Sequence, residues 1–127
     1  MEKPQINCIA RRMYKKVLGK DPGEDLRGIR EFTLNHLYGT IWARDILSLR
    51  DRRLITIALL AAQGHSKQLE DHIIGAIKGD PCLKEDELFE IMLYVGHYAS
   101  WAAGTSGNKI VQKQFPKADD PKESGDS

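Results

Sequence analysis

With 127 residues, the chain has the usual length of one domain, and its 41% hydrophobic and 29% charged residues are ordinary for a globular protein. Its 19 basic and 18 acidic residues give a net charge of +1, which argues against the strongly basic surface of a nucleic-acid-binding protein. No apolar run approaches the roughly 20 residues of a membrane-spanning helix, and the N-terminus lacks a signal-peptide pattern. We therefore expect a cytoplasmic protein without nucleic-acid or membrane partners.

The cysteines and histidines show no metal-binding pattern. Cys8 and Cys82 form no CxxC motif and are expected to be free thiols that act as small buried hydrophobic residues. The four histidines include no HxxxH or HExxH pair on one expected helix. A glycine-rich phosphate loop, a GxSxG motif and a cofactor fingerprint are also missing. We therefore expect neither a metal ion nor a cofactor.

Two amphipathic helices are expected in the first third of the chain. Over residues 5–18, apolar residues recur at helical spacing opposite a basic face: Ile6, Ile9, Met13 and Val17. A second helix is expected over residues 24–38, ended by Gly39, with these residues facing inward: Leu26, Ile29, Phe32, Thr33 and Leu37. Residues 40–47 then form a connector with a tryptophan and an Arg–Asp pair, and such loops beside a core often build sites.

Residues 47–80 are expected to form a central helix pair. Ser48 is a favourable N-cap, and residues 54–62 contain a single polar side chain, which predicts a helix buried on nearly every face. Gly64 ends this helix and Ser66 caps the next one. The second helix has one apolar stripe, formed by Leu69, Ile73, Ala76 and Ile77. His72 lies at the edge of that stripe, one turn from Leu69 and Ala76.

Two further helices complete an all-α prediction with about six helices. One begins with the acidic residues 85–87 and is apolar over most of its circumference, so it should be largely buried; the last spans residues 105–115. Residues 1–115 form one helical domain, and residues 116–127, without a large apolar group, form a disordered tail. Two helices that are apolar on nearly every side carry more apolar surface than so small a domain can bury. This excess predicts a homo-oligomer.

The residues alone leave two interpretations of His72. It is either an ordinary helix-edge histidine or a general acid or base, because its usual pKa of about 6.5 suits proton transfer at neutral pH. On the same basis Arg44 is a surface cation and Trp42 is a core or interface anchor. Tyr98 and Trp101 are assigned to the core. Local composition does not choose between the two interpretations of His72.

Three collinear segments resemble the carboxymuconolactone decarboxylase family over about residues 12–115. They are GTIWARDILSLRDRRLITIALLAAQG, QLEDHIIGAIKGD and KEDELFEIMLYVGHYASWAAG. The most specific pieces are W-x-R at Trp42 and Arg44, R-x-L-I-T-I-A from Arg52, and Q-L-x-x-H ending at His72. The resemblance implies an alkylhydroperoxidase-D-like fold of about six helices around a buried central pair, assembled as a trimer or hexamer.

The decarboxylases of this family remove CO2 from a carboxylated lactone in aromatic catabolism, without a metal or cofactor. The resemblance implies that Arg44 binds a substrate carboxylate and that His72 transfers a proton. It also implies that the substrate pocket is lined by Trp42, Thr40, Tyr98 and Trp101. We therefore interpret the chain as a cofactor-independent carboxy-lyase acting on a small carboxylated lactone or related cyclic acid. The alternative is a non-catalytic homo-oligomer that binds a small molecule.

The chain departs from the family pattern around the implied pocket. Thr40 stands where decarboxylases often carry glutamate, and Asp45 follows Arg44 where a proline is usual. Tyr94 replaces a histidine, and Trp101 adds bulk at the pocket edge. These departures concern the substrate more than the fold.

A thiol peroxidase is not expected. Redox members of the superfamily carry a CxxC motif at the positions of His65 and Gln68, and an assisting glutamate near Arg53. This chain therefore has no thiolate nucleophile at that place.

Overall fold

A computed structural model of the chain describes residues 3–117, and all of the regular secondary structure there is helical. The elements are α1 (Cys8–Leu18), α2 (Ile29–Phe32), the π-helix η1 (Thr33–Ile41), α3 (Leu49–Gln63), α4 (Ser66–Lys78), α5 (Glu85–Tyr98) and α6 (Trp101–Gln114). Because α2 runs directly into η1, the described residues form six helical segments, as predicted. Most of the expected tail, residues 118–127, lies outside the described residues.

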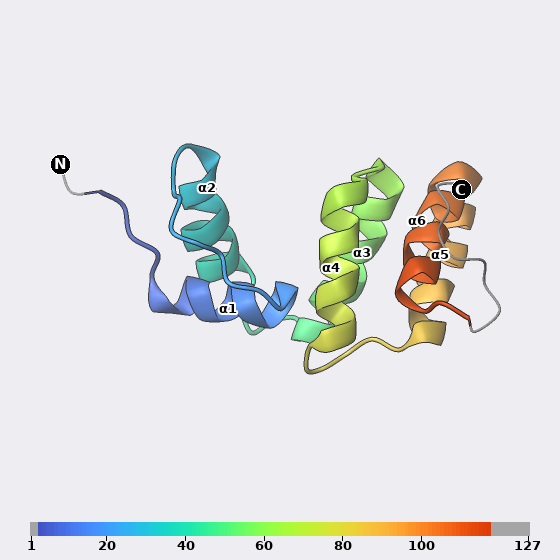
Figure 1. Cartoon of the computed structure of the whole chain (residues 1–127), viewed down its shortest axis with the longest axis horizontal. Coiled ribbons are helices and arrows are strands. Elements are labelled where there is room, and N and C mark those ends of the chain that lie inside the picture. The colour runs from blue at the N-terminus through green and yellow to red at the C-terminus, as the bar shows by residue number, and fades with distance from the viewer. Residues whose placement is uncertain (1–2, 118–127) are drawn as a thin grey trace.

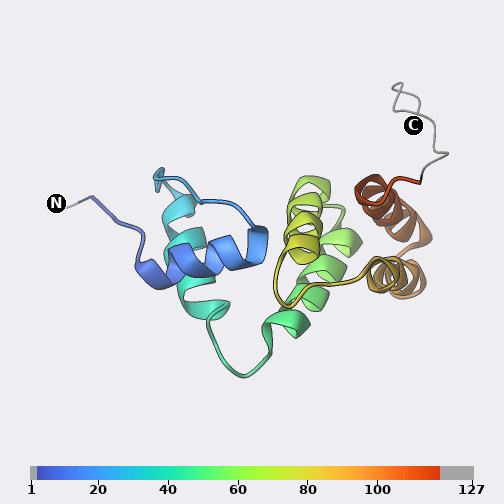
Figure 2. The same cartoon turned by 60° about the horizontal axis from the view of Figure 1, so that its bottom comes forward.

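The helices are arranged as three pairs in a row (Figure 1). The turned view shows the same order, with α1 and α2–η1 at one end, α3 and α4 in the middle, and α5 and α6 at the other end (Figure 2). Within residues 3–117, no helix is both long and apolar enough to cross a membrane.

Two separate hydrophobic clusters support this row. The larger one joins α3, α4, α5 and α6 around Ile57, Ile73, Leu88, Met92 and Val111, all of them buried. The smaller one joins α1 and α2–η1, and its members are Tyr14, Val17, Leu18, Leu26, Leu34, Tyr38 and Trp42. The central pair therefore shares one core with α5 and α6, and it must still be connected to the separate core of α1 and α2–η1.

The connection between the two clusters depends on Arg53 and Gly75. The buried guanidinium of Arg53 on α3 donates hydrogen bonds to the carbonyl oxygens of Val17 (2.8 Å) and Lys16 (2.9 Å) at the end of α1. These carbonyls lack partners within α1 because they lie in its last turn. A Cβ atom on Gly75 of α4 would clash with the carbonyl oxygen of Val17, so glycine permits the close contact of α4 with α1.

Capping explains where the later helices begin and end. The Ser48 hydroxyl accepts a hydrogen bond from the Asp51 amide (3.0 Å), and Gly64 ends α3 at a φ of 75°, both as predicted. Ser66 is already the first residue of α4 rather than its cap, which is His65. The last helix was expected to begin at residue 105, but Ser100 caps it by accepting from the Ala103 amide (3.0 Å), so α6 begins at Trp101.

The second helix differs most from the sequence prediction. Gly39 does not end it, because the helix continues as η1 to Ile41, and a Cβ at Gly39 would lie 3.2 Å from that of Ala10 on α1. The glycine therefore serves a close helix contact. The predicted inward face was largely wrong, because Leu34 and Tyr38 are the residues buried against α1 while Ile29, Phe32 and Leu37 are exposed.

Several apolar side chains predicted to be buried are exposed in the single chain. On α3, Ile55 and Leu59 are exposed, so this helix is not enclosed on nearly every face. On α5, Leu93 and Tyr94 are exposed because the buried stripe of this helix is Leu88, Met92 and Val95, on its other side. The assignment of Tyr98 and Trp101 to the core was wrong, since these side chains are 78% and 65% exposed.

Candidate functional site

Trp42 and His72, two of the predicted site residues, lie against each other. Their rings stack with centroids 6.0 Å apart and planes 15° apart. Trp42 directly follows η1 and is buried, whereas His72 lies in the middle of α4 and is partly buried. The stack therefore holds the imidazole ring between two helices that are distant in sequence, and the flat indole fixes the orientation of that ring.

The surroundings of His72 keep its ring neutral. Burial lowers the pKa of His72 to about 4. The neighbouring carboxylate of Asp71 opposes this shift, whereas the positive charges of Arg53 and Lys20 add to it. At pH 7 the free protein therefore holds a neutral imidazole, which can accept a proton or donate one N–H hydrogen bond.

An aromatic column that the sequence reading missed continues behind Trp42. The ring of Tyr38 stacks on Trp42 (5.9 Å, 15°) and meets Tyr14 of α1 edge-on (5.0 Å, 72°). Burial raises the pKa of Tyr38, so its hydroxyl stays protonated. The signal in the sequence was the four-residue spacing of Tyr38 and Trp42, which the expected helix end at Gly39 concealed.

Arg44 lies two residues beyond Trp42, in the loop between η1 and α3. Its side chain is exposed, and within the described residues its guanidinium makes no ion pair, including none with Asp45. The loop itself is tied to α3, because Arg52 donates to the carbonyl oxygen of Arg44 (3.2 Å). Thr40, in the last turn of η1, is also exposed. Arg44 is therefore an unpaired cation near the stacked pair in sequence.

Tyr98 lies elsewhere in the single chain, at the far end of α5. It stacks on Tyr94 (4.7 Å between centroids) and lines a groove of about 860 Å³ between α3 and α5. The wall of this groove includes Ile55 and Leu59, and its rim carries an ion pair between Arg50 and Glu87. None of Thr40, Trp42, Arg44 and His72 lines this groove.

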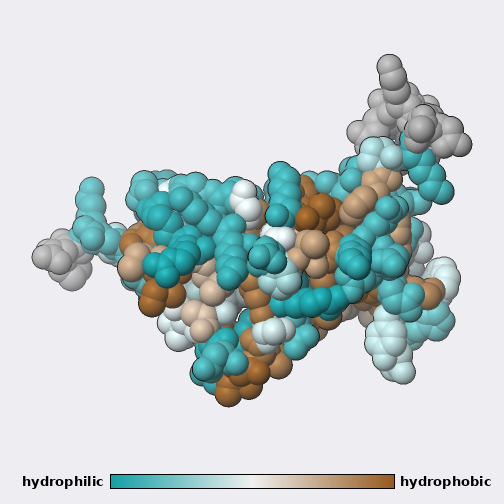
Figure 3. Space-filling model, turned by 90° about the horizontal axis from the view of Figure 1, so that it is seen from below, coloured by the Kyte–Doolittle hydropathy of each residue, from teal (hydrophilic) through white to brown (hydrophobic). Residues whose placement is uncertain are grey.

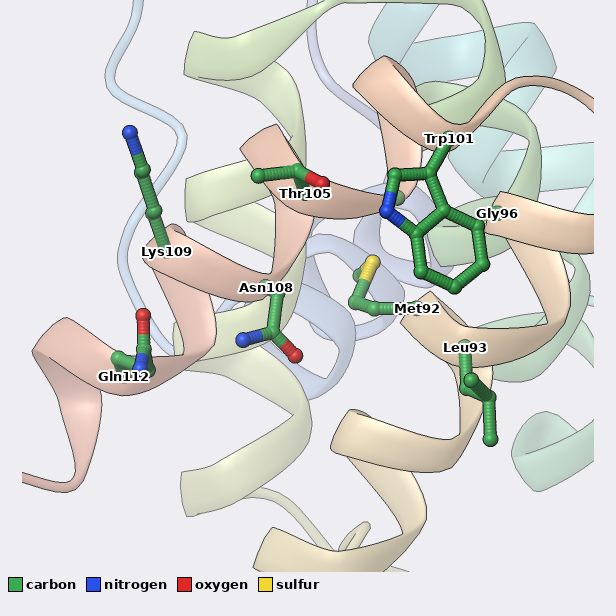
Figure 4. A pocket seen from close by; sticks show the side chains of 9 residues that line it. Met92, Leu93, Gly96, Trp101, Thr105, Asn108, Lys109 and Gln112 are labelled. Atoms are coloured by element: carbon green, nitrogen blue, oxygen red, sulfur yellow. The ribbon is translucent and has the colours of Figure 1, made fainter.

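Trp101 lines a different hollow, of about 280 Å³, between α5 and α6. Figure 4 shows its indole beside Gly96, with polar side chains of α6 along the rest of the hollow. A Cβ at Gly96 would lie 3.2 Å from the indole ring, so glycine lets the ring lie close to α5. The edge of His97 also meets the Trp101 ring (5.5 Å between centroids, 77°). Within one chain, Tyr98 and Trp101 thus line two separate hollows, and neither hollow is lined by Thr40, Trp42, Arg44 or His72.

Metal and thiol ligands are sparse in the described residues. Residues 3–117 contain no group of three or more His, Cys, Asp or Glu side chains that could hold a metal ion. Cys8 begins α1 and Cys82 precedes α5, and both are exposed free thiols, so their assignment as small buried residues was wrong. Arg53, at the position near which redox members would carry a glutamate, is bound to the carbonyls of α1.

The carboxymuconolactone decarboxylase family model matches residues 28–113. The chain therefore belongs to this family. The match begins just before α2 and ends within α6, so it contains all six predicted site residues but not α1.

A curated relative is the 4-carboxymuconolactone decarboxylase of Acinetobacter baylyi. It is 28% identical over 86 residues, which cover 68% of this chain. The matched region spans 63% of the length of the relative.

Proposed function

We propose that this protein is a cofactor-independent carboxy-lyase that removes CO2 from a small carboxylated lactone or related cyclic acid. The observation that carries the proposal is the stacking of Trp42 on His72. The unpaired Arg44 follows Trp42 by two residues in the sequence. These three residues belong to the most specific motifs of the family resemblance. The relative named 4-carboxymuconolactone decarboxylase supports the reaction class.

The proposed reaction requires three functions from the protein. In the first, Arg44 pairs with a substrate carboxylate and orients the ring. In the second, the bond between the ring carbon and the departing carboxylate breaks, and its electron pair moves into the conjugated lactone carbonyl to form an enolate while CO2 leaves. In the third, the enolate carbon takes a proton, so the overall reaction consumes one proton.

His72 is the proposed proton carrier. Its pKa of about 4 in the free protein makes it a neutral ring at pH 7. A substrate carboxylate bound beside the ring favours the charged form and so raises the pKa of His72. The ring then takes a proton from water as the substrate binds and gives it to the enolate carbon after CO2 leaves. Trp42 holds the ring in position and excludes water from one of its faces.

We further propose that the functional unit is a homo-oligomer, either a trimer or a hexamer. Large exposed apolar side chains on α3, α5 and α2–η1 support this proposal, because a solitary chain would leave them in water. Light scattering of the purified protein tests it, and a monomer at micromolar concentration would contradict it.

Release of CO2 from 4-carboxymuconolactone tests the lyase proposal. The expected result is catalytic turnover without added metal or cofactor, with the lactone product identified by NMR. The alternative function, non-catalytic binding, predicts saturable binding of the same compound by calorimetry without CO2 release. The neutral, buried His72 is compatible with binding alone, so turnover decides between the two.

A further inference from the structure

The groove between α3 and α5 has the dimensions and character of a helix-binding site. It holds about 860 Å³, and both of its walls expose large apolar side chains, Ile55 and Leu59 from α3 and Tyr94 and Tyr98 from α5. Neighbouring Ala58 and Ala62 are small, which keeps the floor open. Apolar grooves between two helices commonly bind the apolar face of a third helix.

A helix face of matching character lies at the opposite end of the same chain. The outward side of α2–η1 exposes Ile29, Phe32 and Leu37, with Ile29 82% and Phe32 62% exposed. Its inward side already packs on α1 through Leu34 and Tyr38. The groove and this face belong to different ends of the row of helices (Figure 1), so one chain cannot join them to each other.

A second exposed apolar surface follows the α2–η1 face directly in the sequence. The loop that follows η1 exposes Ile46 and Leu47. Figure 3 shows apolar side chains gathered at the tip of this loop. The apolar face of α2–η1 and the loop are consecutive in sequence, so a partner that covers the helix lies close to the loop.

Charge favours contact between the two different surfaces over contact between two grooves. The groove is lined by Asp86, Glu87 and Glu90 against Arg50 alone, a net charge of −2. Residues 29–47, which carry α2–η1 and the loop, contain Arg30 and Arg44 against Glu31 and Asp45, a net charge of 0. Pairing two grooves would oppose two acidic rims, whereas pairing a groove with the uncharged face of α2–η1 avoids this repulsion.

We propose that the α3–α5 groove of one copy binds the exposed face of α2–η1 of a second copy. This proposal rests on the homo-oligomer proposed above and adds which surfaces meet. The contact is heterologous, because it joins two different surfaces, and successive contacts of this kind form a ring when the rotation between copies closes, as a trimer or hexamer requires. It also brings Thr40 at the end of η1 and Arg44 in the loop of one copy to the groove lined by Tyr98 of its neighbour, uniting predicted site residues that a single chain holds apart.

Site-directed crosslinking tests the proposed contact without any activity assay. In a background with Cys8→Ser and Cys82→Ser, one copy carries Phe32→Cys and a differently tagged, co-expressed copy carries Leu59→Cys. A short bismaleimide should crosslink the two tags to each other. A chain with both substitutions should give crosslinked species larger than a dimer. Lys113→Cys, on the exposed side of α6, is the matched control and should give no crosslinks above background.

Other crosslinking patterns would overturn the proposal. Strong crosslinking of Leu59→Cys to itself would show a groove-on-groove dimer, and self-crosslinking of Phe32→Cys would show a symmetric α2–η1 contact. Absence of mixed crosslinks in an oligomeric sample would exclude the contact altogether.

A second variant does not depend on crosslinking. Leu59→Glu should reduce the molar mass in light scattering to that of the monomer while circular dichroism retains the helical signal, and Lys113→Glu should leave the mass unchanged. An unchanged mass for Leu59→Glu would overturn the proposal. Because both readouts report assembly, failure of the lyase proposal leaves their results unaffected.

Discussion

The indole of Trp42 and the imidazole of His72 stack within 15° of parallel, across the junction of η1 and α4. Thirty residues of sequence separate them, so this contact is made by the tertiary fold rather than by one helix. It places a titratable ring against an aromatic wall and lowers the exposure of that ring to water.

The pH dependence of stability should reveal the neutral state of His72. Its pKa is about 4 in the folded protein, below the usual value of about 6.5 in an unfolded chain. Between these values the unfolded chain binds the extra proton, so the free energy of unfolding should fall by about 3 kcal/mol as the pH decreases from 6.5 to 4. Chemical denaturation at several pH values measures this, and His72→Gln should remove that part of the slope. An equal slope in both proteins would contradict the assignment.

Binding of a carboxylated ligand should be accompanied by proton uptake. The ligand carboxylate favours the imidazolium form of His72 and raises its pKa from about 4 towards the usual value of about 6.5, so the complex should take up part of one proton per site at pH 6. Calorimetry in buffers of different ionisation enthalpy measures the number of protons taken up per site. The ligand is a lactone dicarboxylate that cannot lose CO2. His72→Gln should bind the same ligand without uptake. Uptake that persists in His72→Gln would assign the proton to another group.

Arg53 should be a strong stability determinant without being a site residue. Arg53→Met removes two charge-assisted hydrogen bonds and leaves the carbonyls of Val17 and Lys16 without partners, which should lower the free energy of unfolding by about 2–4 kcal/mol. Arg52→Met is the matched control, because it removes one longer bond to the Arg44 carbonyl and should cost less than about 1 kcal/mol. Urea denaturation measures both, and equal losses would refute the bridging role of Arg53.

The two thiols should be dispensable. Both are exposed and lie on different elements, so neither has the setting of a catalytic nucleophile. Replacing Cys8 and Cys82 together by serine should keep the rate of CO2 release within a few-fold of the unmodified protein. Loss of turnover in a double variant that retains its helical circular dichroism would point to thiol chemistry.

The sequence predicted where the helices lie better than it predicted which of their faces are buried. Ser48 and Gly64 mark the ends of α3 because caps are local interactions that the residues themselves encode. The predicted helix end at Gly39 was wrong because a glycine at a helix contact looks the same in sequence as a glycine at a helix end. That one boundary also hid the spacing of Tyr38 and Trp42, and with it the aromatic column.

The site could be predicted only in part, for a related reason. The motif order identified His72 and Trp42, and the fold brings them together. The positions of Tyr98 and Trp101 relative to that pair depend on tertiary packing, which a list of motifs does not contain. The role of Arg53 could not be predicted, because a buried arginine that binds the end of another helix and a surface arginine have the same local sequence pattern.

Parallel kinetics of His72→Gln and Arg44→Gln on 4-carboxymuconolactone tests the proposed roles most directly. Removing the proton carrier should lower kcat by on the order of 10²–10⁴-fold with little change in KM, because proton transfer occurs in the transition state. Removing the carboxylate-binding cation should mainly raise KM. CO2 release at neutral pH, with assembly checked by light scattering, gives both constants. A kcat of His72→Gln equal to that of the unmodified protein would contradict the account.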